Sequence, residues 1–386
     1  PVLFVGGGAL NRGLRRAMAR VFELDKVAFP AAPEPIFYEA HGAALAAMEQ
    51  AEPQPLAELT AWLEAAGQRE EEAGHETPRL DAPDHSLPGA DTVEVSEPQL
   101  VGEGPVQAYL GVDVGSVSTD LCLISPEREV LDGIYLRTRG DPVGVLREGL
   151  GILRDRVGSR LEVLGVGATG SGRHLAARLL GADVVMNEIT CQLLGARHGL
   201  PDVDTILEIG GQDSKYVSVQ GGHISDFVMN KICAAGTGSF LEEQALGLGV
   251  AIEGEFQQLA LASRNPADLG SQCTVFMDAE VVTARRRGAP LQDILAGLSL
   301  SVAKNYLERV VAGRPIGDRV VVQGGVASNR AVGAAFERLL ERPVMVHPHN
   351  RLSGAIGAAV AAVEEHDANG QSPSSFRGLD AVEQVK

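Results

Sequence analysis

From Tyr109 onward, short apolar runs of strand length alternate with longer stretches of helical periodicity. In the first half, the predicted strands are 109–115, 116–124, 130–136 and 161–166, and the predicted helices are 142–157, 173–180 and 188–198. In the second half, the predicted strands are 205–209, 216–220, 224–229, 320–322 and 344–346, and the predicted helices are 240–246, 291–311, 330–340 and 353–365. Each half is a β-β-β-α-β-α unit, so the pattern predicts an α/β protein whose two duplicated lobes enclose a cleft.

The first 50 residues resemble the end of the chain. The matching positions are Gly6, Gly7, Ala9, Asn11 and Arg12 with Gly324, Gly325, Ala327, Asn329 and Arg330, followed by Gly42–Ala44 with Gly357–Ala359. We interpret residues 1–50 as the partial C-terminal unit of an upstream copy of the same domain. The alternative is a chance similarity of two Gly-Gly turns. Because Pro1 lies inside a predicted strand, we expect the chain to be part of a longer polypeptide.

Residues 51–104 are rich in proline and acidic side chains, which predicts a flexible linker with one short helical pattern at 56–63. The main domain is then expected at 105–366, followed by a polar tail at 367–386. The formal net charge of −18 argues against non-specific nucleic-acid binding, which requires a basic surface. No apolar run is long enough to span a membrane and no signal-peptide pattern is present, so we expect a cytoplasmic protein that binds no membrane.

Two glycine-rich turns occupy equivalent places in the two halves. In the first, Asp113 ends a strand and Gly115, Ser116 and Ser118 follow; in the second, the turn is Gly210, Gly211, Gln212 and Asp213. Glycine N–H and serine O–H groups donate to phosphate oxygens, and the carboxylates suit Mg²⁺. A third turn at Gly324 and Gly325 suits the close approach of a nucleoside. The pattern therefore predicts a nucleotide held between the halves.

A dinucleotide fold is the competing interpretation, because Gly165, Gly167 and Gly170 form a G-x-G-x-x-G pattern after a predicted strand. A single match of this kind is weak. It also leaves Asp113 and Asp213 without a role. We therefore prefer the two-turn nucleotide site.

Of the four cysteines, Cys233 and Cys273 each precede a segment with the features of a helix start. The partial positive charge of a helix N-terminus favours a thiolate. Two thiolates cannot supply the four ligands of a [4Fe–4S] cluster, but two subunits related by a twofold axis can. The alternative is two unrelated core cysteines, which is how we interpret Cys122 and Cys191.

These motifs together resemble the activators of 2-hydroxyacyl-CoA dehydratases and the ATPase subunits of benzoyl-CoA reductase. The matching elements are Asp113–Ser116, Gly167–Gly170, Asn187–Glu188, Glu208–Asp213, Lys231–Gly238, Cys273–Phe276 and Gly324–Ala327. The resemblance covers about residues 107–366 and implies the actin-like ATPase fold, with duplicated ribonuclease H-like lobes and the nucleotide between them. It also implies a homodimer that binds one [4Fe–4S] cluster through Cys233 and Cys273.

The same resemblance assigns roles within the cleft. It implies that Asp113 and Asp213 hold Mg²⁺ and water, and that Glu188 orients the attacking water. The positions expected to bind ATP or ADP are Gly115, Ser116, Ser118, Gly210, Gly211, Gln212, Gly236, Thr237, Gly238, Gly324, Gly325 and Asn329. The implied activity is ATP-driven delivery of a low-potential electron.

The resemblance also implies partners for this electron transfer. The electron would come from a ferredoxin- or flavodoxin-type donor and go to an iron–sulfur dehydratase or reductase component, either separate or in the same longer polypeptide. Two alternatives remain open at this point. One is a small-molecule kinase of the same fold, and the other is a nucleotide-regulated scaffold without a cluster.

Overall fold

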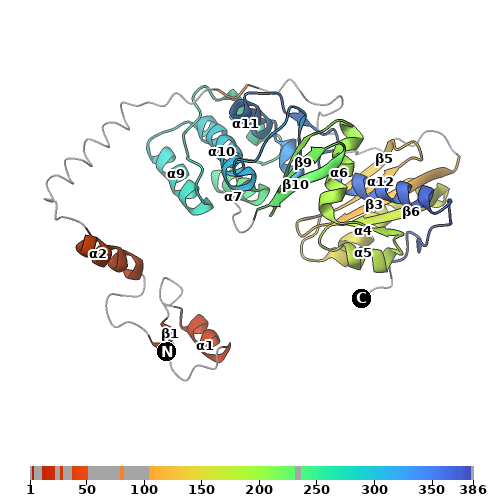
Figure 1. The fold of residues 1–386 in the computed structure, drawn as a ribbon, viewed down its shortest axis with the longest axis horizontal. Coiled ribbons are helices and arrows are strands. Elements are labelled where there is room, and N and C mark those ends of the chain that lie inside the picture. The colour runs from red at the N-terminus through yellow and green to blue at the C-terminus, as the bar shows by residue number, and fades with distance from the viewer. Residues whose placement is uncertain are drawn as a thin grey trace. The chain divides into compact units, whose positions relative to one another are not determined.

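The computed structural model describes residues 2–3, 11–21, 27–28, 37–50, 79–81, 104–230 and 236–383. The chain divides into two compact units, residues 1–75 and 76–386, and each is considered by itself (Figure 1). Nowhere in these described ranges is there a helix both long and apolar enough to cross a membrane.

The first unit contains two short parallel strands and two helices. They are β1 (Val2–Leu3), α1 (Arg12–Val21), β2 (Val27–Ala28) and α2 (Tyr38–Gln50). The side chain of Asn11 caps α1, because its Oδ1 accepts hydrogen bonds from the N–H groups of Gly13 and Leu14 at 2.9 and 3.0 Å. The glycines of the repeated motif, Gly6 and Gly7, lie outside the described residues.

Lobe 1 of the second unit is a five-stranded mixed sheet in the order β5-β4-β3-β6-β7. Its elements are β3 (Val106–Val114), β4 (Ser118–Ile124), β5 (Val130–Arg137), α4 (Pro142–Val157), β6 (Leu161–Thr169), α5 (Arg173–Leu180) and β7 (Val184–Val185). Helices α4 and α5 pack on the sheet through one apolar cluster that includes Leu110, Leu121, Leu146 and Ala176. A separate cluster joins β3 and β4 to the last helix, α12 (Ser353–Ala368).

Lobe 2 repeats the strand order as β10-β9-β8-β11-β12. Its strands are β8 (Thr205–Ile209), β9 (Ser214–Gln220), β10 (His223–Met229), β11 (Val320–Gln323) and β12 (Met345–Val346). Its helices are α7 (Gly238–Leu248), α8 (Glu255–Ala262), α9 (Thr274–Arg286), α10 (Leu291–Tyr306) and α11 (Arg330–Leu340). In both lobes the first three strands are antiparallel neighbours and the fourth and fifth join in parallel. The prediction of two duplicated α/β lobes is therefore confirmed.

Two helices connect the lobes at the centre of this unit, α6 (Glu188–Gly199) and α12. Helix α6 packs against the sheet of lobe 2, and α12 packs against the sheet of lobe 1 (Figure 1). Glycines permit this contact, because a Cβ at Gly195 would lie 2.0 Å from the carbonyl oxygen of Ser353 and a Cβ at Gly357 would lie 1.9 Å from that of Cys191. The two helices therefore pack backbone to backbone.

The buried cysteines belong to this central packing. Cys122 on β4 lies in the cluster under α12, and Cys191 is the α6 residue that Gly357 contacts. Burial raises the pKa of the Cys122 thiol well above its ordinary value and that of Cys191 to about 12. Their interpretation as buried apolar residues is confirmed.

The residues after α12, predicted to be a polar tail, fold back onto lobe 1. Val382 is fully buried in the cluster beneath α4, and the hydroxyl groups of Ser374 and Ser375 donate to Asp183 at 2.6 and 2.7 Å. Arg154 on α4 also pairs with Asp380 at 2.7 Å. This segment is polar in composition but contributes an apolar anchor to the lobe.

The last unit of lobe 2 has the same order of elements as the first 50 residues. In both, a strand is followed by a helix that an asparagine caps, a second parallel strand and a second helix. Asn329 caps α11 by accepting a hydrogen bond from the N–H of Ala331 at 3.0 Å, as Asn11 caps α1. Residues 1–50 thus share this order of elements with the end of the chain, and their interpretation as part of a repeat stays a prediction.

Candidate functional site

A cleft of about 270 Å³ lies between the two lobes of the second unit. Most of the predicted nucleotide-binding residues line it, and these are Asp113, Gly115, Ser116, Ser118, Glu188, Gly210, Gly211, Gln212, Asp213, Gly238, Gly324, Gly325 and Asn329. Gly236 and Thr237, also predicted to bind the nucleotide, do not line the cleft: Thr237 is fully buried, and Gly236 lies close to Asn305 and Tyr306 of α10. Segments far apart in the sequence therefore meet in one cavity.

The turn between β3 and β4 forms the lobe 1 wall of the cleft. It is closed by the N–H of Gly115, which donates to the carbonyl of Ser118 at 2.8 Å, and by the Thr138 hydroxyl, which donates to the carbonyl of Gly115 at 2.9 Å. Asp113 lies at the end of β3 between two glycines. A Cβ at Gly170 or Gly354 would lie 2.3 or 1.9 Å from its carboxylate oxygens. Only glycine leaves room for this carboxylate.

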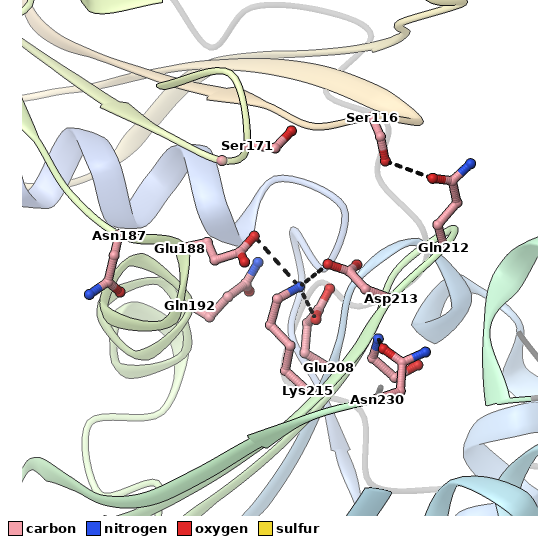
Figure 2. A network of polar contacts seen from close by, with 12 residues as sticks. Ser116, Ser171, Asn187, Glu188, Gln192, Glu208, Gln212, Asp213, Lys215 and Asn230 are labelled. Atoms are coloured by element: carbon pink, nitrogen blue, oxygen red, sulfur yellow. Dashed lines mark hydrogen bonds and ion pairs between the residues drawn. The ribbon is translucent and has the colours of Figure 1, made fainter. Parts of the chain in front are cut away.

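Three carboxylates surround one lysine at the base of the cleft (Figure 2). The Nζ atom of Lys215 lies 2.9 Å from Glu208, 3.1 Å from Asp213 and 3.8 Å from Glu188. The lysine and Glu208 are directly opposite each other on β9 and β8, and both side chains are buried. Asp113 lines the same cleft, and the positive charge of Lys215 partly offsets the effect of burial on its carboxyl group.

The surroundings shift the acid–base properties of this cluster. Burial raises the pKa of Asp113 to about 6, although Lys215 opposes the shift. Burial likewise raises the pKa of Glu208 to about 7, again against the effect of Lys215. For Lys215 itself, burial disfavours the charge, but Glu208, Asp213 and Glu188 outweigh burial and raise its pKa. The lysine is therefore a fixed positive charge within an acidic pocket.

Lys215 and Glu208 were not predicted as members of the site. The available signal was the alternation of side chains along β9. Lys215 falls on the same face as Val217 and Val219, which are both buried. A lysine at such a position requires a buried acidic partner. Glu208 is the acidic residue of the neighbouring strand β8 that pairs in register with Lys215.

A second unpredicted carboxylate, Asp120, faces Asp113 across β3 and β4. Its side chain is buried and lines the cleft, and Ser118 donates to its Oδ2 at 3.2 Å. Its Oδ1 has no hydrogen-bond partner among the described residues. Burial, followed by the charge of Asp113, raises the pKa of Asp120 well above its ordinary value.

Several contacts join the two lobes across the cleft. The hydroxyl of Ser116 donates to Oε1 of Gln212 at 3.1 Å, which connects the two phosphate-type turns (Figure 2). Arg137 on β5 forms an ion pair with Glu242 on α7. The Arg351 guanidinium also lies 5.2 Å from the centre of the lobe 1 ring of Tyr135. These contacts hold the lobes close together.

Ser214 connects the cleft to the segment that contains Cys233. Its N–H donates to Asn230 Oδ1 at 2.9 Å, its carbonyl accepts from the Asn230 N–H at 2.9 Å, and its hydroxyl donates to the carbonyl of Gly236 at 2.6 Å. Cys233 itself lies outside the described residues, which end at 230 and resume at 236. Both described ends of its segment are therefore bonded to the residue between Asp213 and Lys215.

Cys273 is exposed at the start of α9, where it is the N-cap residue. Its carbonyl accepts the N–H groups of Phe276 and Met277 at 3.0 and 3.1 Å, so the prediction that a helix follows this cysteine is confirmed. Asn305 on α10 fixes the preceding loop by donating to the carbonyls of Ser271 and Gln272 at 2.7 and 3.0 Å. Cys273 is thus exposed at a helix end whose preceding loop is held in place by Asn305.

The chemistry of the cleft fits a magnesium ion that arrives with its nucleotide. No group of three or more histidine, cysteine, aspartate or glutamate side chains within the described ranges could hold a metal ion unaided. Mg²⁺ at nucleotide sites takes one or two carboxylates and completes its shell with phosphate and water oxygens. Asp113 and Asp213 line the cleft, and the Asp213 side chain is 44% exposed, so both can serve in this way.

Comparison with known proteins identifies the family of the domain that contains this cleft. The model of the BadF/BadG/BcrA/BcrD ATPase family matches residues 110–362. The chain belongs to this family. The domain is therefore an ATP-binding ATPase, and the resemblance predicted from the motifs is confirmed.

Individual relatives of this ATPase domain agree with the assignment. The (R)-2-hydroxyglutaryl-CoA dehydratase activating ATPase of Acidaminococcus fermentans is 32% identical over 256 residues, which cover 66% of this chain and 97% of that protein. One of the subunits of the benzoyl-CoA reductase of Thauera aromatica is 26% identical over 67% of this chain and 93% of that protein.

A solved structure supports the fold of the ATPase domain. The activator of the 2-hydroxyisocaproyl-CoA dehydratase from Clostridium difficile, with ADPNP bound, has a TM-score of 0.60 and 29% identity and covers 69% of this chain and 98% of that chain. The actin-like ATPase fold predicted from the motifs is confirmed.

Proposed function

We propose that the ATPase domain uses ATP to drive delivery of a low-potential electron to an iron–sulfur dehydratase or reductase component. The observation that carries this proposal is the bonding of Ser214, which connects the predicted Mg²⁺–nucleotide site to both described ends of the segment that contains Cys233. The relatives named as dehydratase activators and as part of a reductase support the same partner class.

In this proposal the cleft residues bind and hydrolyse ATP. Asp113 and Asp213 hold Mg²⁺ and water, and the N–H groups of the turns at Gly115 and Gly210–Gln212 contact the phosphates. Glu188 orients the attacking water from the first residue of α6, a position that the Asn187 cap fixes by accepting the Thr190 N–H at 2.9 Å.

On the lobe 2 side, Gly238, Gly324, Gly325 and Asn329 accommodate phosphate and nucleoside. A Cβ at Gly324, whose φ is +88°, would lie 2.4 Å from the carbonyl of Ile209. The turn therefore adopts a close approach that only glycine permits, which leaves backbone groups available to the ligand.

Two chains together would hold one [4Fe–4S] cluster, with Cys233 and Cys273 from each. The cluster would supply a carrier for a single electron. Cys273 fits this role because it is exposed at a helix N-terminus, and because the neighbouring side chains of Val275 and Phe276 are 73% and 59% exposed. Apolar side chains that are exposed in the single chain suit a subunit interface.

A ferredoxin- or flavodoxin-type protein would provide the electron, and the dehydratase or reductase component would accept it, either as a separate protein or within a longer polypeptide. Such low-potential exchange suits the reducing cytoplasm. Residues 105–366 form the catalytic domain in this proposal, and residues 1–50 form the partial unit of an upstream copy that the linker at 51–104 connects to it.

The test is iron content after anaerobic purification. We expect about four iron atoms per two chains, and we expect Cys233→Ala and Cys273→Ala each to lose them. Cys191→Ala is the matched control, because this thiol is buried between α6 and α12 and should leave iron content unchanged. If the cysteine variants keep the iron of the wild type, or the wild type contains none, the electron-transfer proposal is wrong while the ATPase assignment remains.

A further inference from the structure

Leu80 is an apolar anchor within the segment predicted to be a flexible linker. Its side chain is 1% exposed, whereas the adjacent Arg79 and Asp81 are both exposed. It belongs to the apolar core of lobe 2, together with residues from its strands and helices. Leu80 is therefore inserted into lobe 2, although it lies far from that lobe in sequence and both of its charged neighbours face solvent.

This anchor lies outside the domain shared by the family. The family match begins at residue 110, well after Leu80. In the Acidaminococcus relative, the 256 matched residues already account for 97% of the protein, so almost no chain remains to provide a corresponding segment. The apolar site that Leu80 fills is thus formed by lobe 2 and completed by a segment outside the part of the chain that the family shares.

Within the described residues 79–81, the Leu80 side chain is the part that packs into lobe 2. In the part of the chain that the structure describes, no backbone hydrogen bond joins residues 79–81 to lobe 2. The free energy gained by burying one leucine is similar in size to the entropy lost when two or three backbone residues are fixed. The docked and released states are therefore close in free energy, which is a property of reversible docking rather than of a core element.

We propose that residues 79–81 are an intramolecular docking motif, in which Leu80 fills an apolar pocket of lobe 2 and tethers the linker to the ATPase domain. The occupant of the pocket is this chain's own linker. Tethering gives the motif a high effective concentration, so a contact of one side chain suffices. The proposal is independent of the cluster and of electron transfer.

Trypsin provides a direct test on the full chain, because Arg69 and Arg79 are the only lysine or arginine residues of the linker at 51–104. Docking buries Leu80 and protects the bond after Arg79, so cleavage there should be slower than in a synthetic peptide of residues 65–90. Because the docked and released states are close in free energy, a large share of the wild-type chains is open at any time. Leu80→Ala should therefore accelerate cleavage after Arg79 about twofold, to the rate of the peptide, with cleavage after Arg69 unchanged. A peptide carrying the same substitution corrects for any preference of trypsin.

Leu80→Met is the matched variant, because a side chain of similar volume should still fill the pocket and keep the protection. Circular dichroism checks that each variant is folded. If the wild type is cut after Arg79 at the rate of the peptide, or if folded Leu80→Ala is cut no faster than the wild type, the motif does not dock. If Leu80→Ala instead unfolds lobe 2, Leu80 is a structural core residue and the proposal is also wrong.

Discussion

The buried pair of Lys215 and Glu208 allows a quantitative test of the electrostatics of the cleft. Their charged atoms are 2.9 Å apart, and their side chains are only 4% and 5% exposed. Lys215→Met leaves the Glu208 carboxylate buried without its counter-ion, which should lower the free energy of unfolding by about 3–5 kcal/mol. Adding Glu208→Gln removes the unpaired charge, so the double variant should recover most of the loss.

The loss should depend on pH in a defined direction. Burial raises the pKa of Glu208 from 4.5 to about 7 in the folded protein, and removing Lys215 raises it further. Between 4.5 and the raised value, the folded state holds a proton that the unfolded state has released. Stability then falls as pH rises through this window. The deficit of Lys215→Met should therefore be smaller at about pH 5 than at about pH 8.

Chemical denaturation followed by circular dichroism measures these differences. Arg319→Met is the matched control, because Arg319 also lies 2.9 Å from its partner, Asp202, but their side chains are 44% and 66% exposed. Loss of such an exposed pair should cost less than about 1 kcal/mol. The reasoning is refuted if Lys215→Met costs no more than this control, or if the double variant is no more stable than Lys215→Met.

Two further perturbations test the cleft directly. Gly354→Ala should lower the rate of ATP hydrolysis about 100-fold, because the added Cβ would lie 1.9 Å from Asp113 Oδ2 and displace this carboxylate. The control is Gly247→Ala, which should leave the rate unchanged because no atom lies within 4 Å of the added Cβ. Arg137→Gln breaks the half-exposed ion pair with Glu242 and should speed release of a fluorescent ADP analogue about fivefold in stopped flow. An unchanged release rate would show that this pair does not hold the lobes together.

Much of the fold could be predicted because its strands carry clear local patterns. The apolar runs at β3, β4, β8 and β11 and the helical periodicity of α4 and α11 locate these elements within a few residues. Helix α8 and the short strand β7 were not predicted. Eight and two residues long respectively, they are too short for a periodic signal to stand out from their surroundings.

The candidate site was only partly predictable, because sequence motifs report backbone turns better than side-chain partners. The glycine turns identified the walls of the cleft. The pairing of Lys215 with Glu208 depends on the register of β8 and β9, and the contact of Ser116 with Gln212 joins residues 96 positions apart. Neither is specified by local pattern, and the same holds for the burial of Leu80 from within a linker of low hydrophobicity.

The start of β9 provides a route by which, in the proposed function, nucleotide binding in the cleft would affect the segment that contains Cys233. Successive side chains of a strand point to opposite faces, so Asp213 and Lys215 face the acidic cluster while the Ser214 side chain between them points the other way, toward the carbonyl of Gly236. The Ser214 backbone bonds to Asn230. Mg²⁺ binding at Asp213 would weaken its attraction to Lys215, since both cations compete for one carboxylate. Any resulting movement of this strand end would be transmitted through three hydrogen bonds of Ser214 to the segment on its far side.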